Sequence, residues 1–303
     1  MATEQAKQVE KVRRFNRTVA ERVGMLHDHY LGSARPYGQA RLLWQIGDEG
    51  THDVRSVRAQ LGLDSGYVSR LLRALEHDGL VTVEPHPRDR RIRTVRLTEA
   101  GREERAMLDE RSDALAGSLL DPLNARQRDQ LTAAMAEVER LLTASVVSLD
   151  VVDPDHPDAA HCLRSYAAEL QELFDGGFDP ARSRLPDPGE LRAPRGLFLI
   201  ARLHGEPVGC AGLKLPTRAP AEIKRLWVHP RARGLGLARR LLSELEERAA
   251  RHGSELVRLD TNKALQAATR LYRSSGYDEV PAFNDEPYAH HWFQKRLARG
   301  TQD

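Results

Sequence analysis

A glycine-rich turn between two segments of opposite hydrophobic pattern constrains this chain most. The turn reads Arg-Ala-Arg-Gly-Leu-Gly-Leu-Ala over residues 231–238. Residues 222–229 before it are bulky or β-branched and end at Pro230, whereas residues 237–252 repeat apolar side chains at the spacing of one helix face. A strand that enters a helix through glycines leaves backbone N–H groups free at the positive helix end. The pattern therefore predicts an anion site.

Two common phosphate-binding motifs do not fit this turn. No Lys-Ser or Lys-Thr pair follows the glycines, which excludes the P-loop of nucleoside triphosphatases. The glycine spacing and the downstream acidic residues do not match the dinucleotide-binding pattern either. The pyrophosphate of another carrier remains as the expected anion.

Arg233-x-x-Gly236-x-Ala238 resembles the pyrophosphate loop of the GNAT superfamily of acyl-CoA-dependent N-acetyltransferases. An earlier register, starting at Arg231, also fits formally. The similarity extends from about residue 163 to 297 and includes expected strands at 196–201, 207–213 and 256–260. It implies an α/β domain with a mixed sheet that uses acetyl-CoA as co-substrate, without a metal, and transfers the acetyl group directly to an amine.

The resemblance also assigns site residues. Glu222 would deprotonate the amine, and Tyr272 would protonate the coenzyme thiolate. Pairing of Glu222 with Lys224 and a core position for Tyr272 are the structural alternatives. Many relatives carry Asn where this chain has Leu265, and Asn262 is either a substitute or a helix cap. The expected cofactor-binding residues are Leu226, Trp227 and Val228 along the pantetheine arm, Arg233, Gly234, Leu235, Gly236, Leu237 and Ala238 at the pyrophosphate, and Asn262.

The acceptor pocket is less defined by the sequence. Candidates for its lining are Tyr166, the segment 174–178, and His290, His291 and Trp292 near the C-terminus. Core packing explains each of them equally well. The two histidines have no third ligand nearby, so metal binding is not expected.

The first half has a helical pattern. Residues 4–30 place apolar side chains at three- and four-residue steps, which predicts a long amphipathic helix. Further helices are expected around 39–46, at 54–61 and, after a tight turn, at 65–77, with Asp64 and Ser65 as N-cap candidates. Two short helices around such a turn form a helix-turn-helix. The face of the second helix expected toward solvent or DNA comprises Ser65, Tyr67, Ser69, Arg70 and Arg73.

A β-hairpin is expected next, from strands at 80–83 and 92–97. Residues 85–96 contain five arginines and one aspartate, and a basic hairpin tip suits a narrow minor groove. Together with Ser69–Glu76, Gly79–Val81 and Leu97–Gly101, the hairpin resembles the MarR family of winged-helix repressors. Solvated arginines and a solubilising hairpin are the alternatives. The resemblance implies double-stranded DNA as a partner and DNA contacts at the tip from Arg88, Asp89, Arg90 and Arg91.

The MarR resemblance also implies a homodimer formed through the terminal helices. A stripe of Leu131, Met135, Val138 and Leu142 supports this independently. Packing of the stripe within its own domain is the alternative.

Residues 150–158 contain two prolines and four acidic residues, which predicts a stiff connector. The expected organisation is a mainly α winged helix-turn-helix domain at 1–147, a linker at 148–158 and a GNAT-like α/β domain at 159–303. A length of 303 residues suits two domains. A net charge of +2 argues against a generally basic coat, so the hairpin patch is local.

No apolar run is long enough to span a bilayer, the N-terminus lacks an export signal, and the two cysteines have no metal-binding spacing. We therefore expect a cytoplasmic protein without membrane partners. The expected function is a transcriptional regulator that also acetylates a small-molecule amine. The alternatives are an acyl-CoA-sensing repressor without turnover, and an acetyltransferase whose N-terminal domain is only a dimerisation scaffold.

Overall fold

The computed structural model describes residues 2–25, 30–47, 50–87, 89–183 and 188–297. The chain divides into two compact units, Met1–Ala134 and Met135–Asp303. Each unit has its own buried core. Among the described helices, none has both the length and the apolar character needed to cross a membrane.

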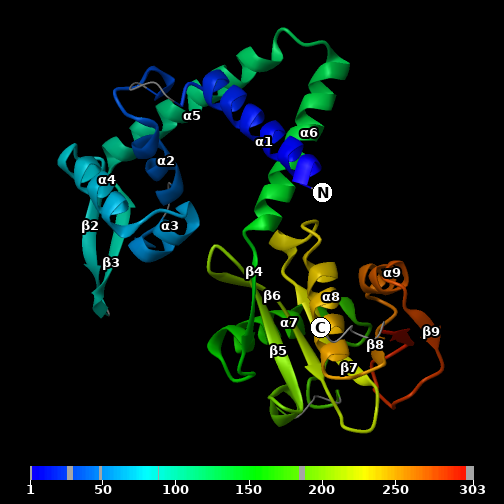
Figure 1. Cartoon of the computed structure of the whole chain (residues 1–303). Coiled ribbons are helices and arrows are strands. Elements are labelled where there is room, and N and C mark those ends of the chain that lie inside the picture. Colours follow the sequence, from blue (N-terminus) through cyan, green and yellow to red (C-terminus); the bar gives the residue numbers. More distant parts are fainter. Residues whose placement is uncertain (1, 26–29, 48–49, 88, 184–187, 298–303) are drawn as a thin grey trace. The chain divides into compact units, whose positions relative to one another are not determined.

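The first unit is mainly helical (Figure 1). A three-stranded sheet of order β1-β3-β2 lies beside the helices, and β2 and β3 form the expected hairpin. Both of its strands are longer than predicted. The elements are α1 (Ala2–Arg22), a 3-10 turn (Tyr30–Gly32), α2 (Tyr37–Ile46), β1 (His52–Asp53), α3 (Val54–Leu61), α4 (Ser65–His77), β2 (Val81–His86), β3 (Asp89–Leu97), α5 (Glu99–Leu120) and α6 (Ala125–Ser145), the last of which continues into the second unit.

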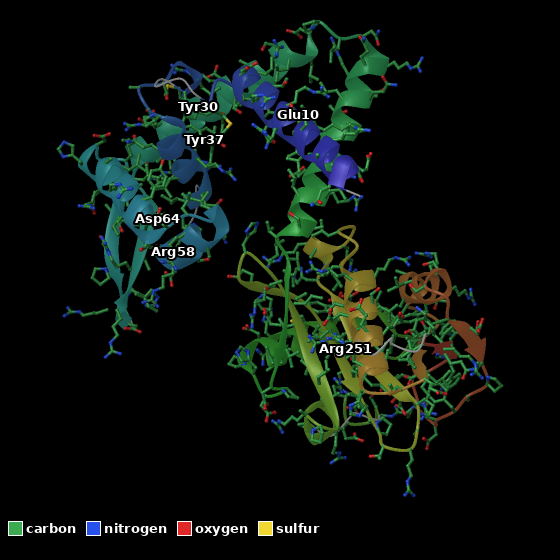
Figure 2. All side chains as sticks on the ribbon, viewed as in Figure 1. Glu10, Tyr30, Tyr37, Arg58, Asp64 and Arg251 are labelled. Atoms are coloured by element: carbon green, nitrogen blue, oxygen red, sulfur yellow. The ribbon has the colours of Figure 1, made fainter. Side chains whose placement is uncertain are left out.

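Local signals explain the helix-turn-helix of α3 and α4. Gly62 ends α3 with a left-handed φ of 64°, a conformation that glycine adopts without strain. The Asp64 side chain then accepts a hydrogen bond from the Tyr67 N–H at 2.9 Å and caps α4 (Figure 2). The core-facing side chains Val68, Leu71, Leu72 and Leu75 are all buried. These predicted boundaries are confirmed.

The second unit is a seven-stranded sheet with helices on both faces. Its strand order is β4-β5-β6-β7-β8-β10-β9, and β7 and β8 are the parallel pair. The predicted strands are present, and β4 and β9 are additional. The elements are β4 (Ser148–Val152), α7 (Pro157–Leu173), a 3-10 turn (Pro188–Leu191), β5 (Gly196–Leu203), β6 (Glu206–Lys214), β7 (Ala221–Val228), a 3-10 turn (Pro230–Ala232), α8 (Leu237–Arg251), β8 (Leu256–Thr261), α9 (Gln266–Ser274), β9 (Asp278–Val280) and β10 (His291–Arg296).

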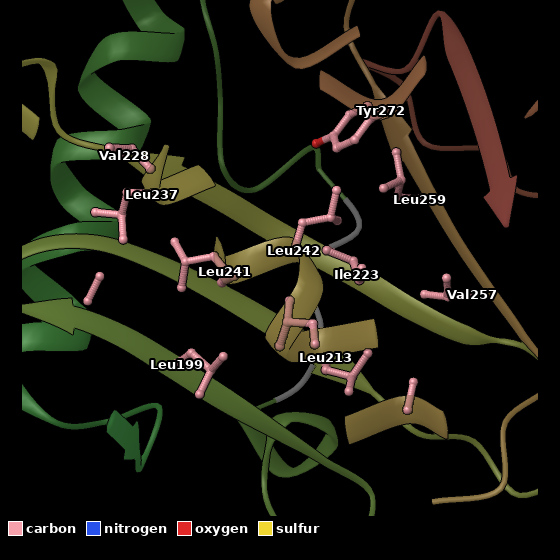
Figure 3. Packing of buried hydrophobic residues seen from close by; sticks show 14 of the residues in the cluster. Leu199, Leu213, Ile223, Val228, Leu237, Leu241, Leu242, Val257, Leu259 and Tyr272 are labelled. Atoms are coloured by element: carbon pink, nitrogen blue, oxygen red, sulfur yellow. The ribbon is translucent and has the colours of Figure 1, made fainter. Parts of the chain in front are cut away.

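Alternation along β5 shows how the sheet is covered. Leu199 and Ala201 face the cluster that contains Leu241 and Leu242 of α8 (Figure 3). Phe198 and Ile200 face the opposite cluster, with Cys162 of α7. A strand buried on both faces has a continuous apolar sequence, as observed here.

The structure does not contain the linker expected at 148–158. Residues 148–152 form the edge strand β4, which pairs antiparallel with β5, and Pro157 begins α7. The acidic residues that suggested a solvated connector have arginine partners. Arg192 pairs with Asp153 and Asp155, while Arg202 pairs with Asp150 and Asp158. The boundary between the compact units lies earlier, inside α6.

The first helix also differs from its prediction. It ends at Arg22, and residues 26–29 of the expected helix lie outside the described residues. Four of its apolar side chains are exposed, those of Val9, Val12, Phe15 and Val19.

Candidate active site

The glycine-rich loop joins β7 to α8 and leaves its backbone open. Gly234 and Gly236 have φ values of 81° and 72°, and a Cβ added to either would meet nothing within 4 Å. Gly236 is the N-cap residue of α8, with no side-chain hydrogen bond to the helix end. Among the described residues, the N–H groups of 234–239 have no hydrogen-bond acceptor. These features are the ones that an anion site at a helix N-terminus requires, and anion binding by this loop stays a prediction.

Arg233, unlike the loop residues that follow it, donates hydrogen bonds within the protein through both its N–H and its guanidinium. Its N–H donates to the Pro230 carbonyl, so this amide is engaged within the turn. Its guanidinium donates to the Val228 carbonyl at 3.1 Å and to the Glu169 carboxylate at 2.5 Å. Trp227 Nε1 donates to the same carboxylate at 2.8 Å. Arg233 therefore fixes the loop against β7 and α7.

Beside this loop the sheet opens. The pairing of β7 with β8 covers only Ala221 with Val257 and Glu222 with Arg258. Beyond it lies a groove of about 620 Å³, lined by the edge of β7, the glycine-rich loop and the first turn of α9. Its lining includes the predicted residues Leu226, Trp227, Val228, Arg233, Gly234, Gly236, Leu237 and Ala238.

A second cavity of about 110 Å³ adjoins the groove. The two share the lining residues Tyr166, Leu226, Leu265 and Ala268, so they form one continuous site. The charged residues of the second cavity are Lys224, Arg225, Asp260 and Glu286. A long groove that ends at a small, charged and aromatic cavity can place an extended carrier against a compact acceptor.

The family comparisons agree with this geometry. The acetyltransferase (GNAT) family model matches residues 163–277. An IAA acetyltransferase of Azospirillum brasilense is 36% identical over 131 residues, which make up 42% of this chain and 84% of that protein. The chain belongs to the GNAT family.

Other matches cover the same half. The N-alpha-acetyltransferase RimI of Mycobacterium tuberculosis is 34% identical over 146 residues, or 46% of this chain and 84% of the relative. A crystal structure of a GNAT acetyltransferase from Staphylococcus aureus is 16% identical and covers 50% of this chain and 100% of its own, with a TM-score of 0.43. In the first unit, the MarR family model matches residues 36–92. The chain is thus an N-acetyltransferase of the GNAT family with a MarR domain before it.

Tyr272 belongs to the buried core of this GNAT domain (Figure 3), and it is also one of the residues that line the second cavity. Its ring packs against Tyr277 and Phe293, at centroid distances of 5.9 and 5.7 Å. The structure describes no hydrogen-bond partner for its hydroxyl among the residues it covers. Burial raises the pKa of Tyr272 above its usual value, so the phenol is protonated at neutral pH. Both interpretations of this residue, core aromatic and proton donor, suit its position.

Glu222 is engaged by cations. Its carboxylate accepts from Arg258 at 2.6 Å and lies 3.6 Å from Lys224 Nζ. Burial alone would raise the pKa of Glu222, but Arg258 and Lys224 together lower it. Among the described residues, Glu222 does not line either part of the site, whereas Asp260 does. The pairing with Lys224 is present, and the role of Glu222 as a base stays a prediction.

The Glu222→Gln variant is expected to lower the free energy of unfolding at neutral pH by about 2 kcal/mol, because Arg258 loses a charge-assisted hydrogen bond. The lowered pKa sets the sign. The stabilisation is present above the usual value of 4.5 and is lost as the pH falls through the lowered value of the folded state. Urea titrations on both sides of pH 4.5 measure this. The difference from wild type should shrink in acid, and a difference that grows there would contradict this account.

Asn262 closes a turn after β8. Its side chain donates to the Tyr288 carbonyl at 2.7 Å and accepts from the Ala264 N–H at 2.8 Å. It lines the second cavity, but these bonds engage both of its polar atoms. A contact of Asn262 with the pantetheine arm stays a prediction.

Only some of the residues predicted for the acceptor pocket line the second cavity. Tyr166, Phe174 and Phe178 line the second cavity. His290, His291 and Trp292 are not among its described lining residues, and His291 instead pairs with Glu279. The cavity is also lined by four residues that were not predicted from the sequence: Arg225, Asp260, Glu286 and Tyr288.

The MarR domain presents the expected basic face. On α4, Ser65, Arg70 and Arg73 are exposed, and Ser69 is half-buried. Tyr67 instead packs on the core, with Arg70 over its ring at 5.7 Å.

In the hairpin, Arg90 and Arg91 are exposed, and Asp89 accepts from the Arg91 N–H at 3.0 Å, which orders the tip. Arg88 lies outside the described residues.

Proposed function

We propose that this chain is a DNA-binding regulator that also transfers the acetyl group of acetyl-CoA directly to the amine of a small molecule. The enzymatic part rests on the junction of groove and cavity at Leu226, with Tyr272 among the residues that line the cavity. Two substrates that enter from the two sides would meet at this junction.

The residues of the groove fit acetyl-CoA, which would supply the acetyl group as a reactive thioester. The N–H groups of 234–238 would bind the pyrophosphate, because no side chain at Gly234 or Gly236 covers them. The edge of β7 from Leu226 to Val228 would lie along the pantetheine arm, where β8 no longer pairs with it. Arg233 would hold the loop in this shape rather than bind the anion itself.

Two proton transfers complete the reaction. Tyr272 would donate its proton to the leaving thiolate. Glu222 remains a prediction for the step that deprotonates the amine, and its engaged carboxylate would have to act through water. The test is to incubate the protein with acetyl-CoA and a mixture of amines and to search by mass spectrometry for acetylated products. Formation of one such product supports the proposal, and intact acetyl-CoA with every amine contradicts it.

One observation favours a second function, acyl-CoA sensing. Helix α6 begins in the MarR unit and ends in the GNAT unit. Near its end, Arg140 donates to the Gly234 carbonyl at 3.2 Å, so the helix contacts the loop proposed for the pyrophosphate. Acetyl-CoA bound at the loop would then shift the equilibrium between two conformations of α6, provided that it binds these conformations with unequal affinity.

We further propose that the chain forms a homodimer through its terminal helices. Val9, Val12 and Phe15 on α1 are 51%, 57% and 47% exposed, and Met135 and Leu142 on α6 are 50% and 61% exposed. Apolar stripes of this kind indicate contact with another surface. Two-fold symmetry would present two α4 helices to a pseudo-palindromic DNA site.

DNA binding by the hairpin is tested by an Arg90→Ala/Arg91→Ala double variant. On a mixed-sequence duplex, the slope of log affinity against log salt should fall by about 2, because each phosphate contact contributes about 0.9. Arg251→Ala is the matched control, since this exposed arginine lies on α8 of the GNAT unit (Figure 2). Equal salt slopes for the double variant and wild type would contradict hairpin contact with DNA.

A further inference from the structure

Arg225 is distinguished by its missing partner. Lys224, its neighbour, pairs with Asp260, and Asp260 also accepts from Asn284 at 3.0 Å. Arg225 lines the same cavity, yet its guanidinium has no hydrogen bond or ion pair with any residue that the structure describes. A cationic group in this position can bind an anion from outside the chain.

The backbone at Arg225 is unusual as well. Opposite Ala211, β7 carries one extra residue, because the register with β6 shifts between Cys210 and Gly212. Arg225 is part of this bulge and has a φ of 57°, a left-handed conformation that is unfavourable for a residue with a Cβ. Bulges re-aim side chains and strained backbone collects at functional sites, so this geometry suits a side chain directed into the cavity.

Burial adds to the argument. The guanidinium is half-buried, and burial lowers the pKa of Arg225. The charge of Glu286 raises this pKa in part, but no ion pair with a described residue offsets the loss of water, so a bound anion would stabilise the guanidinium.

The surroundings indicate which anion fits. Four charged residues line the cavity, and the two acids, Asp260 and Glu286, balance the two bases formally. These acids would repel a doubly charged phosphate more strongly than a singly charged carboxylate, which needs one cation and matches the planar guanidinium. Both acids already have partners, Asp260 in Lys224 and Asn284, and Glu286 in Ser183 and the Tyr288 N–H, but their negative charge still favours an ammonium group on the same molecule over a second anion. The cavity is thus suited to a zwitterion.

The wall of the cavity is aromatic. Phe174, Phe178 and Tyr288 contact one another, with ring centroids 5.0 to 5.9 Å apart. They offer an apolar surface beside the charged groups.

We infer that the acceptor is an amino acid with an apolar side chain, bound through its carboxylate by Arg225. This inference rests on the proposed acetyl transfer and names its substrate class. Arg225 would determine specificity, since it binds the part of the acceptor that does not react.

The test compares matched acceptors in an assay of acetyl-CoA-dependent thiol release. The probes are phenylalanine and leucine, their amides, the amines phenethylamine and isoamylamine, and the phosphonate analogue of phenylalanine. We expect kcat/KM for the amino acids to exceed that for the amides and amines by about 100-fold. Faster reaction of the phosphonate than of phenylalanine would overturn the choice of a carboxylate.

Variants assign the preference to Arg225. Arg225→Gln should lower kcat/KM for the amino acids about 100-fold and leave the amines nearly unchanged. Arg225→Gly should lower kcat/KM for the amino acids in the same way. Because glycine adopts the left-handed φ of this position without strain, this variant replaces Arg225→Gln if the latter does not fold. Arg270→Gln, at an exposed position of α9, is the matched control. Equal losses for amino acids and amines would overturn the inference.

A titration of phenylalanine or leucine into the protein saturated with CoA separates this inference from the proposed function. If no amine is acetylated, the proposed transfer fails, yet binding that Arg225→Gln abolishes still supports carboxylate recognition. If amines without a carboxylate are acetylated as well as the amino acids, the transfer stands and the inference fails. If the amino acids neither react nor bind, the inference is overturned.

Discussion

The Tyr272→Phe variant is expected to bind acetyl-CoA as tightly as wild type and to transfer the acetyl group at least about 100-fold more slowly. Only the hydroxyl is removed, and it has no partner among the described residues, so the ring contacts with Tyr277 and Phe293 remain. The loss should appear in kcat and not in KM for acetyl-CoA, because the proton transfer occurs only in the reaction. Steady-state thiol release measures kcat and KM, and thermal unfolding shows whether the variant keeps the stability of wild type.

Tyr277→Phe is the matched control. Tyr277 is a buried tyrosine of the same core, and it is absent from the described lining of the site. It should retain kcat within a few-fold of wild type. Equal activity of Tyr272→Phe and wild type would assign Tyr272 to core packing alone.

The Gly236→Val variant is expected to weaken acetyl-CoA binding by about 100-fold or more. A side chain at this N-cap would project over amides that otherwise have no acceptor, and each lost hydrogen bond to a charged group costs about 1.5–3 kcal/mol. The left-handed φ of 72° also strains a β-branched residue. Equilibrium titration with acetyl-CoA measures the affinity, and thermal unfolding measures the strain.

Gly253→Val separates the two effects. Gly253 follows α8 with a φ of 90°, and a Cβ there would also meet nothing within 4 Å. Both variants should lose about 1–3 kcal/mol of stability, but only Gly236→Val should lose affinity. Equal affinities of the two variants would show that the loop does not bind the pyrophosphate.

The parts of the fold that depend on local sequence were predictable. The capped helix after Asp64, the glycine-rich turn into α8 and the hairpin of β2 and β3 each involve residues close in the chain. Their signals are turn geometry, capping and periodicity, which do not require knowledge of distant partners.

The sequence was least informative where residues far apart in the chain determine the structure. Part of the acidic segment 150–158 is a strand because it pairs with β5, and Arg192 and Arg202 balance its charge. Glu222 was predicted as a base without knowledge that Arg258, on the neighbouring strand, would occupy its carboxylate. Arg225 could not be predicted as a site residue because the bulge that contains it depends on the register between β6 and β7. Strand pairing and long-range ion pairs leave little trace in a single sequence.

The most direct test of the central claim is thiol release from acetyl-CoA by the purified full chain, measured across amino acids, amines and polyamines. We predict thiol release that requires one class of amine, is fastest with apolar amino acids and is nearly lost in Tyr272→Phe. Tight binding of acetyl-CoA without release for any acceptor would contradict the proposed transfer and leave acyl-CoA sensing by the MarR-linked domain as the function to pursue.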